Sequence, residues 1–352
     1  MTLDYSSLVA STIKLNKKGF SNNITRNFIF TAILGAPDLA TEVFGLEKPE
    51  GEFSEGIKLV EGGEKIFMPL MYARNTTIEG YSGYDPLNIT PTDPFTACEY
   101  EWRRIAGSIN VDNDRLDKNA GSAVKLFDLL KGMMQNLRIS YQESWNDMLL
   151  KAKASGSKEP LGLFDLVKDD PSTNPASGAL GGVDAVANTW WRNQKRDQGL
   201  VAFGSDQTGA GMVALRGLLR DCAFGTDKPK VLISGETAYE AVENTMLNQI
   251  RYVSDKEKAL AKAGFDAIMV KGLPMVMEKR ITALRSEQGL SGDAIYAINP
   301  KYFKLYGMKH RWFEPSKVKE PVNQDTQVQH LITACQLTTD NRRTSGVLFG
   351  IA

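Results

Sequence analysis

The sequence predicts an α+β protein in which one long helix and several β-strands support a separate α/β lobe. Three observations carry this prediction. A polar, turn-rich stretch with short strand patterns covers about residues 46–119, an over-long helical pattern follows it, and strands alternate with helices between 208 and 270 before further strands appear. At 352 residues the chain is long enough for two or three lobes, since domains usually contain about 100 to 200 residues.

The turn-rich stretch predicts a two-stranded projection rather than a compact domain. Apolar residues cluster or alternate in Ile57–Val60 and Lys65–Met71, and the intervening Glu61–Glu64 favours a tight turn between the two. After a loop rich in glycine and proline, alternation returns over Ala97–Val111. Such a stretch is too long for an ordinary connection.

A long helix is predicted from Ser122 to about Ala152. At a rise of about 1.5 Å per residue, these roughly 31 residues make a rod of about 45 Å. Ser122 is a suitable N-cap, and most helices are only about 11 or 12 residues long, so we expect this one to act as a spine for other layers. Its apolar residues recur at steps of three and four, a spacing that only a helix brings onto one face: Leu126, Leu130, Met133, Leu137, Tyr141, Trp145 and Met148.

The second half predicts an α/β lobe followed by strands. Helices and strands alternate in it, which is typical of an α/β arrangement. The predicted helices are Thr208–Phe224 and Glu236–Ile250, and the predicted strands are Lys230–Ile233, Ala267–Val270, Ala294–Ile298, Val328–Leu337 and Ser345–Ile351. The last two strands are candidates for an antiparallel hairpin.

Composition and charge argue against several classes of protein. The 42 basic and 42 acidic side chains cancel, whereas a dedicated nucleic-acid binder is usually more basic. The N-terminus lacks the basic and apolar regions of a signal peptide, and no window approaches the ~20 apolar residues of a membrane span. Cys98, Cys222 and Cys335 lie far apart, which predicts three buried or half-buried thiols rather than a disulfide framework.

No residue pattern points to catalysis, and we assign no catalytic, cofactor-binding or metal-ligating residue. His310 and His330 are the only histidines, and their spacing matches neither a helical zinc motif nor a zinc finger. The glycine-rich Gly204–Gly211 opens a predicted helix but satisfies neither a Walker loop nor a dinucleotide fingerprint, which favours a helix-capping loop. We therefore predict that the protein is not an enzyme and uses no cofactor.

Several segments resemble one known family. They are Pro69–Thr77 (PLMYARNTT), Tyr81–Asp85 (YSGYD), Trp190–Gln194 (WWRNQ), Gln336–Thr339 (QLTT) and Ser345–Ile351 (SGVLFGI). Together with the order of elements from about residue 25 onward, they resemble the major capsid protein of tailed bacteriophages (Caudoviricetes), whose fold is shared with encapsulins.

The resemblance implies a fold with an N-terminal arm, an extended β-hairpin loop, a peripheral domain and an axial α/β domain. In that family the peripheral domain is built on a long spine helix and a β-sheet. Mapped onto this chain, the arm is 1–45, the extended loop 46–110, the peripheral domain 111–205 and 321–352 with its spine helix at 122–153, and the axial domain 206–320.

The resemblance also implies a structural function. Pentamers and hexamers of a major capsid protein assemble in the cytoplasm of the bacterial host into an icosahedral head, which encloses double-stranded DNA and becomes the virion capsid. An isolated hairpin is marginally stable in water, so its partner would be a neighbouring subunit. The candidate intersubunit contacts are polar and aromatic residues of the loop and of a short aromatic segment: Arg74, Tyr81, Tyr84, Phe95, Trp190 and Trp191.

Further partners follow from the same resemblance. The chain starts with Met1 and has only a short polar stretch before the apolar Phe28–Leu34, so we expect a separate scaffolding protein rather than a scaffolding region removed by proteolysis. A portal, a possible decoration protein and DNA contacted without sequence specificity complete the expected partners, and no membrane is expected. Candidates for a DNA-facing wall, or for subunit contacts, are the basic clusters Arg103–Arg104, Lys195–Arg196, Lys309–Arg311 and Arg342–Arg343.

Two other functions stay open at this point. An encapsulin-like compartment shares the fold but encloses cargo enzymes instead of a genome, and a neighbouring peroxidase or ferritin-like gene would favour it. A cytoplasmic α/β enzyme would use the lobe at 204–285, although the missing nucleotide loop and the scarcity of histidine argue against this class.

Overall fold

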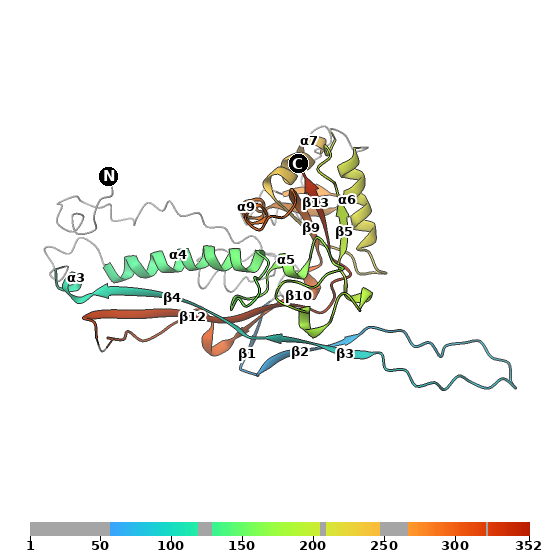
Figure 1. Ribbon diagram of the computed structural model, residues 1–352, viewed down its shortest axis with the longest axis horizontal. Helices are drawn as coiled ribbons and strands as arrows, with labels where there is room; N and C mark the ends of the chain where they lie inside the picture. The colour runs from blue at the N-terminus through green and yellow to red at the C-terminus, as the bar shows by residue number, and fades with distance from the viewer. Residues whose placement is uncertain (1–56, 119–128, 205–208, 247–266, 322) are drawn as a thin grey trace.

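The computed structural model describes residues 57–118, 129–204, 209–246, 267–321 and 323–352. The predicted arm 1–45 therefore lies outside the described residues, and so does the first part of the helix predicted at 122–153, which is seen as α4 (Leu129–Leu150). Figure 1 shows α4 lying over two long strands, a lobe rising above one end of them, and a narrow hairpin extending away from the body. No described helix is both long and apolar enough to cross a membrane.

A five-stranded sheet forms the base of the molecule. Its longest ladder is antiparallel and joins two strands, β4 and β12, that lie more than 200 residues apart in the chain. The order is β1 (Ile57–Val60), β10 (Phe303–Met308), β12 (Thr326–Thr339) and β11 (Glu314–Pro315), and β4 (Arg103–Asp112) also pairs with β12. Short helices connect these parts: α3 (Asn113–Lys118), α5 (Leu163–Leu166), η2 (Leu180–Gly182), η3 (Thr189–Trp191), η5 (Pro300–Tyr302) and η6 (Lys309–Arg311).

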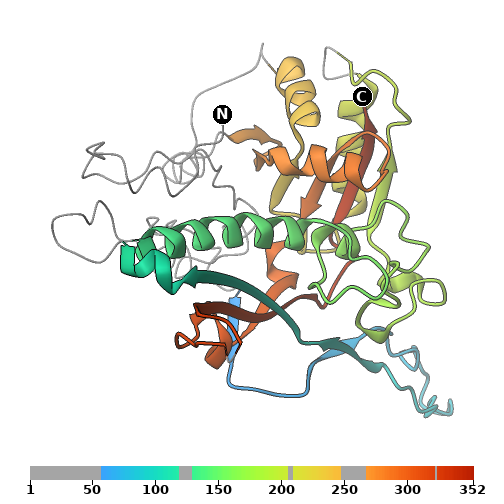
Figure 2. The same ribbon diagram turned by 60° about the vertical axis from the view of Figure 1, so that its left-hand side comes forward.

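The helix α4 packs along β4, as Figures 1 and 2 both show. The Tyr141 hydroxyl donates a hydrogen bond of 3.2 Å to the carbonyl oxygen of Ile105 in β4. Gly107 permits this close approach, because a Cβ atom at that position would lie only 2.8 Å from Leu137 Cδ1. Two of the periodic apolar residues used to predict the helix, Leu137 and Tyr141, therefore contact the sheet.

The lobe is built on a six-stranded sheet covered by three helices, α6 (Ala210–Asp221), α7 (Glu236–Met246) and α9 (Lys279–Glu287). Its strands β6 and β9 are buried on both faces, which explains their uninterrupted apolar sequences. The strand order is β5 (Gln194–Asp197), β13 (Gly346–Ile351), β9 (Asp293–Ile298), β6 (Val231–Ser234), β8 (Leu273–Met277) and β7 (Ala267–Val270).

The two faces of this sheet contribute to two separate apolar clusters. Leu232 and Ile295 pack with residues of α6 and α7 on one face. Val231 and Tyr296 face the other way and join a larger cluster that includes Trp145 of α4. The second cluster makes the lobe and the base one continuous core, because it contains residues of both sheets.

Polar side chains of α9 and its C-cap strengthen the junction with α4. Arg280 forms an ion pair with Asp147 of α4, its Nε donating to the carboxylate at 2.9 Å. Gln288 pairs with the backbone of Ala152 in both directions, donating from Nε2 at 2.9 Å and accepting the amide N–H at 3.2 Å. The end of α4 is therefore held by the lobe.

Arg285 of α9 is the most deeply buried cation at this junction, with 1% of its side chain exposed. Its five N–H donors are all used: two on the Asp169 carboxylate, one on the Tyr296 hydroxyl, and one each on the carbonyl oxygens of Gly292 and Ser291. A guanidinium group removed from water is tolerated here because every donor has an acceptor.

Two strand pairings predicted from the sequence are wrong. The turn at Glu61–Glu64 does not form a hairpin, since β1 pairs in parallel with β10, whereas Lys65–Met71 (β2) pairs with Phe95–Glu101 (β3). The last two strands do not pair either, because β12 belongs to the base and β13 to the lobe. Between these two strands lies Arg342, whose buried side chain donates a hydrogen bond of 2.8 Å to the Leu166 carbonyl oxygen.

Sheet membership also differs from the ranges mapped onto the chain. Strand β10 lies within 206–320 but belongs to the base, and β13 lies within 321–352 but belongs to the lobe. Strand β4 reaches Asp112 and is part of the base, so the projecting hairpin consists of residues 65–101. The division into four domains remains a prediction.

Candidate assembly surfaces

The hairpin has a buried inner face at its base. Met68, Cys98 and Tyr100 are buried, and the Tyr100 hydroxyl donates to the Thr339 carbonyl oxygen of β12 at 2.8 Å. The inner face rests on η2, where Gly181 has a φ of +62° and a Cβ atom would lie 3.1 Å from Cys98 Sγ. Only glycine combines this backbone conformation with such a close approach.

The outer face of the same hairpin is apolar and exposed. Phe67 is 61% exposed, Met71 74% and Phe95 65%. Met71 and Phe95 lie opposite each other in the β2–β3 register, so they form one patch. Buried and exposed residues alternate regularly along β2, yet two of its four exposed positions, Phe67 and Met71, carry large apolar side chains, which is typical of a protein interaction surface.

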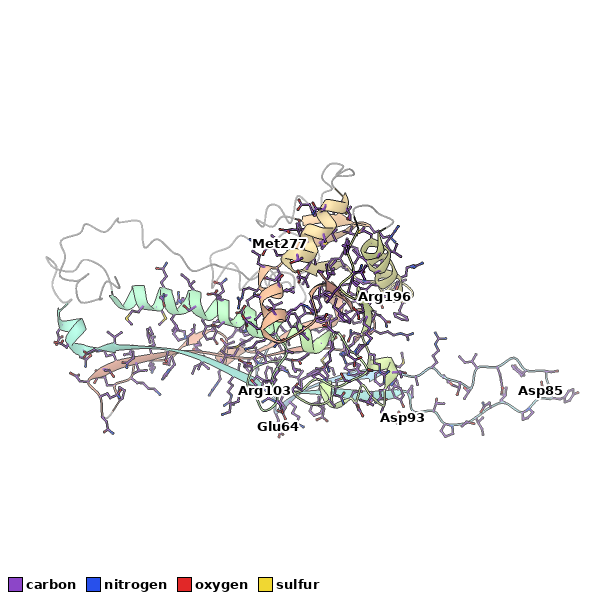
Figure 3. The ribbon with its side chains drawn as sticks, turned by 45° about the horizontal axis from the view of Figure 1, so that its top comes forward. Glu64, Asp85, Asp93, Arg103, Arg196 and Met277 are labelled. Atoms are coloured by element: carbon purple, nitrogen blue, oxygen red, sulfur yellow. The ribbon has the colours of Figure 1, made fainter. Side chains whose placement is uncertain are left out.

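The hairpin continues into a distal loop, residues 72–94, that extends away from the body (Figures 1 and 3). Local hydrogen bonds shape this loop. The Ser82 amide donates to Asp85 Oδ2 at 2.8 Å, the Asp85 amide donates to the Ser82 carbonyl at 2.8 Å, and the Asn88 amide donates to Glu79 Oε1 at 3.1 Å. Its large apolar residues are nevertheless exposed: Ile78, Tyr81, Tyr84, Leu87 and Ile89.

Four of the six predicted contact residues lie on this hairpin and are exposed: Arg74, Tyr81, Tyr84 and Phe95. Tyr84 keeps its full side-chain exposure, at 102% of the reference value. Their contact role between subunits remains a prediction.

The two tryptophans among the predicted contact residues differ in their burial. Trp190 is half-buried, and its ring stacks on Tyr72 at the root of the distal loop, with 5.2 Å between centroids and 23° between planes. Trp191 is only 1% exposed, and its Nε1 donates to the Leu180 carbonyl oxygen at 3.2 Å. The structure corrects the prediction for Trp191, which is a core residue. Because the segment is the short 3₁₀ helix η3 rather than a strand, the sequence pattern did not say which ring is buried.

A polar pocket of about 430 Å³ lies beside Trp190 on the body. No sequence pattern indicates this pocket, because its walls come from three separate segments of the chain. Its lining residues are Pro171, Thr189, Trp190, Arg192, Asn193, Gln194, Lys195 and Arg343.

Beneath the pocket and the hairpin lie two buried charged groups. Arg342 donates from Nε to the Leu166 carbonyl and from Nη2 to Asn193 Oδ1 at 3.1 Å, and burial lowers the pKa of its guanidinium to about 10. Asp165 accepts the amide N–H of Lys153 at 2.8 Å. Burial raises the pKa of the Asp165 carboxyl to about 6, against the opposing effect of this hydrogen bond.

The predicted basic clusters contain buried, ion-paired and exposed residues. Arg342 is buried, so it is not available to DNA or to a neighbour, which corrects that candidate. Arg103 forms an ion pair with Glu101 at 2.7 Å and Arg196 with Asp221 at 2.6 Å. The exposed members are Arg104, Lys195, Arg196, Lys309, His310, Arg311 and Arg343.

The three cysteines are free and buried, as predicted. Burial raises the pKa of Cys98 and Cys222 to about 12 and that of Cys335 to about 11, so these thiols are poor nucleophiles at neutral pH. Among the described residues, no three acidic, histidine or cysteine side chains lie close enough together to hold a metal ion.

No protein-family model matches the sequence, and no curated protein matches it either. Solved structures do match. The cyanophage A-1(L) capsid asymmetric unit gives a TM-score of 0.59 at 13% identity, covering 94% of this chain and 97% of that one. The capsid of an empty GTA particle gives 0.56 at 10%, covering 95% of each chain, and the capsid of Myoviridae phage XM1 gives 0.54 at 11%, covering 85% and 91%.

These likenesses extend over most of each chain. The three matched structures are all of capsids. The α+β architecture described above is the tailed-phage capsid fold that the sequence predicts.

Proposed function

We propose that this chain is the major capsid protein of a tailed bacteriophage, a subunit whose copies pack into a closed shell. The observation that carries the proposal is the projecting hairpin, whose outer face and distal loop expose large apolar side chains to solvent. A monomeric protein rarely leaves such a surface uncovered. Burial of apolar surface contributes about 25 cal/mol per Å², so covering it with a second copy would stabilise an assembly.

In this proposal the chains form pentamers and hexamers that close into an icosahedral head around double-stranded DNA. The body would move as one unit, because α9 ties the end of α4 to the lobe through Arg280 and Gln288. The hairpin is fixed to the body only at its base, so its distal loop can absorb the different angles between subunits. Many modest contacts repeated around a shell add up to a stable particle.

The same proposal includes the partners expected from the sequence. A separate scaffolding protein and a portal would direct assembly in the bacterial cytoplasm, and a decoration protein is a possible addition to the virion. DNA would be contacted without sequence specificity by exposed cations such as Arg104 and Arg311. The domain ranges would follow the sheets, with the arm at 1–45 and the extended loop narrowed to 65–101.

The test is the mass and shape of the purified protein, expressed alone and together with the proteins encoded beside it. Light scattering and negative-stain microscopy should show shells, tubes or five- and six-fold rings. A matched variant replaces residues 73–93 by a short turn, since Tyr72 and Pro94 already form a backbone hydrogen bond there. That variant should keep the fold and lose assembly. A persistent monomer of the complete chain under all of these conditions would contradict the proposal.

A further inference from the structure

The polar pocket beside Trp190 is lined by hydrogen-bond donors that carry positive charge. Arg192, Lys195 and Arg343 are its charged lining residues, and Asp170 forms an ion pair with Lys195 at 3.0 Å. Three cations against this one carboxylate leave a net charge of about +2 at the pocket. The volume of the pocket, about 430 Å³, is within the range of sites that hold small ligands.

The two arginines of the pocket are held in place without being neutralised. Arg192 donates from Nε to the Ala185 carbonyl oxygen at 2.7 Å and from Nη2 to that of Val186 at 2.8 Å, whereas its Nη1 donates to no described residue. The guanidinium carbon of Arg343 lies 3.7 Å from the centre of the Phe224 ring, and its guanidinium has no hydrogen-bond acceptor among the described residues. Both guanidinium groups are therefore fixed and keep free donors for an anion.

The charged residues next to the lining already have partners of their own. Arg196, labelled in Figure 3, follows Lys195 in β5, where successive side chains point to opposite faces. It donates to Asp221 of α6 from Nε at 2.8 Å and from Nη2 at 2.6 Å. Asp184 Oδ1 accepts two hydrogen bonds of 2.8 Å, one of them from Asn174 Nδ2. These pairings leave the arginines of the pocket without a carboxylate of their own in the described part of the chain.

The chemistry of the lining favours a phosphate group over a carboxylate. A phosphate monoester carries a charge of about −1.5 to −2 at neutral pH and has three acceptor oxygens. This charge matches the excess of about +2, whereas a carboxylate would leave about half of the excess unmatched. The donors come from two sides, because Arg192 and Lys195 belong to the η3–β5 segment and Arg343 to the connection between β12 and β13. Thr189 adds a hydroxyl group to the wall.

We propose that this pocket is a binding site for a small phosphate-bearing ligand, either inorganic phosphate or the phosphate of a nucleotide. The phosphate oxygens accept from Arg192 and Arg343, and Lys195 contributes its charge. In a nucleotide, the sugar and base fill the remaining volume beside Trp190. The site is formed within one chain, so the inference does not rest on the shell function. Because only the folded chain forms the site, the ligand stabilises the fold.

Calorimetric titration of the complete chain with inorganic phosphate is the primary test, at about 0.1 M salt, where charges more than ~10 Å apart are largely screened. We expect one saturable site per chain. Arg343→Gln should weaken phosphate binding about tenfold, because it removes a charged donor. Arg343→Lys should weaken it by about threefold, since an ammonium group cannot bind in bidentate fashion. The control Lys317→Gln changes an exposed residue outside the lining and should stay within about twofold of the wild type.

Two further ligands identify the source of the phosphate. Adenosine 5′-monophosphate that binds about fivefold or more tightly than inorganic phosphate would indicate a nucleotide site, and equal affinities would indicate a site for free phosphate. Either result supports the proposal. Adenosine, which lacks the phosphate, should not compete with inorganic phosphate.

The proposal would be overturned by the absence of saturable phosphate binding or by an unchanged affinity in Arg343→Gln. It would also be overturned if a DNA duplex without terminal phosphates bound more tightly than both phosphate ligands and lost affinity in Arg343→Gln, because the pocket would then belong to a DNA-contacting surface. Circular dichroism checks that the variants fold. As a second readout, saturating phosphate should raise the Tm of the wild type by about 1–3 °C, and that of Arg343→Gln by less.

Discussion

The distal loop exposes large apolar side chains to solvent, whereas the junction between α4 and α9 buries even a charged side chain. In the loop, Tyr84 and Ile89 are exposed, and beyond the Tyr72–Pro94 hydrogen bond at its root the backbone is held by hydrogen bonds within the loop itself. At the junction even a guanidinium group, that of Arg285, is buried and fully hydrogen-bonded. The junction stabilises the single chain, whereas the apolar groups of the loop contribute nothing to it until another molecule covers them.

The largest expected effect concerns Arg285. Replacing it with methionine leaves Asp169, Tyr296 and two carbonyl oxygens without their donor. Breaking a buried charge pair in this way should lower the free energy of unfolding by about 3–5 kcal/mol, measured by urea denaturation. The exposed Arg220 provides a control, and its change to methionine should have an effect within about 0.5 kcal/mol. Equal effects of the two variants would show that the junction is not the stabilising region described here.

The adjacent Trp190 and Trp191 allow an exposed and a buried position to be compared within a single helical turn. Trp191→Ala opens a cavity and leaves the Leu180 carbonyl without its donor, so the free energy of unfolding should fall by about 3–5 kcal/mol. Trp190→Ala removes the stacking on Tyr72, an edge contact with Trp191 and a hydrogen bond to Asn188, all at a half-buried site, and should cost only about 1 kcal/mol. Thermal denaturation of both variants checks the order. If Trp190→Ala proved the more damaging, its ring would be part of the core and not of the hairpin root.

Because the Asp165 carboxyl is buried, the free energy of unfolding should depend on pH. Its folded-state pKa of about 6 lies above the unfolded value near 3.8, so its contribution to stability is fully present below the lower value and is lost as the pH rises through about 6. The loss by pH 8 should amount to about 1–3 kcal/mol. Asp165→Asn retains an acceptor for the Lys153 amide and removes the titration. Urea denaturation at pH 4.5 and pH 8 should therefore show a smaller decrease for the variant; equal decreases would contradict this account.

The smallest effect on the single chain is expected in the distal loop. Tyr84→Ser should change the free energy of unfolding by less than about 0.5 kcal/mol, since its ring is fully exposed and packs against no described residue. The same variant should reduce particle yield in the light-scattering assay. A substantial loss of monomer stability would mean that the loop folds against its own body.

Much of the architecture follows from the sequence because the periodic patterns are long. The helix α4, the strand β7 and the strands β9, β12 and β13 lie within a few residues of their predicted positions. Strands β9 and β13 are buried along almost their whole length and α4 buries Tyr141, Trp145 and Leu149 on one face, and such continuous or periodic apolar patterns predict structure well.

Strand pairing was harder to predict, for a physical reason. A turn such as Glu61–Glu64 favours a local hairpin, but β1 gains more by pairing with β10, which lies about 250 residues further along the chain. Likewise β12 and β13 separate because each completes a different sheet. Long-range partners of this kind leave no local signal in one sequence.

The candidate surfaces likewise include features that the sequence indicates and features that depend on the tertiary fold. Exposure of Tyr81 and Tyr84 follows from a turn-rich segment with no apolar periodicity, and the sequence indicates it. The difference between Trp190 and Trp191 depends on η3, a single 3₁₀ turn that has no recognisable pattern. The pocket depends on Pro171 and Arg343 meeting in space, which requires the tertiary fold.

The position of β13 has a consequence for synthesis on the ribosome. This strand is made after every other strand of its sheet, yet it lies between β5 and β9, and β5 has no other partner among the described strands. The lobe can therefore close only once residue 351 has left the exit tunnel, and an incomplete chain displays an unfinished sheet edge.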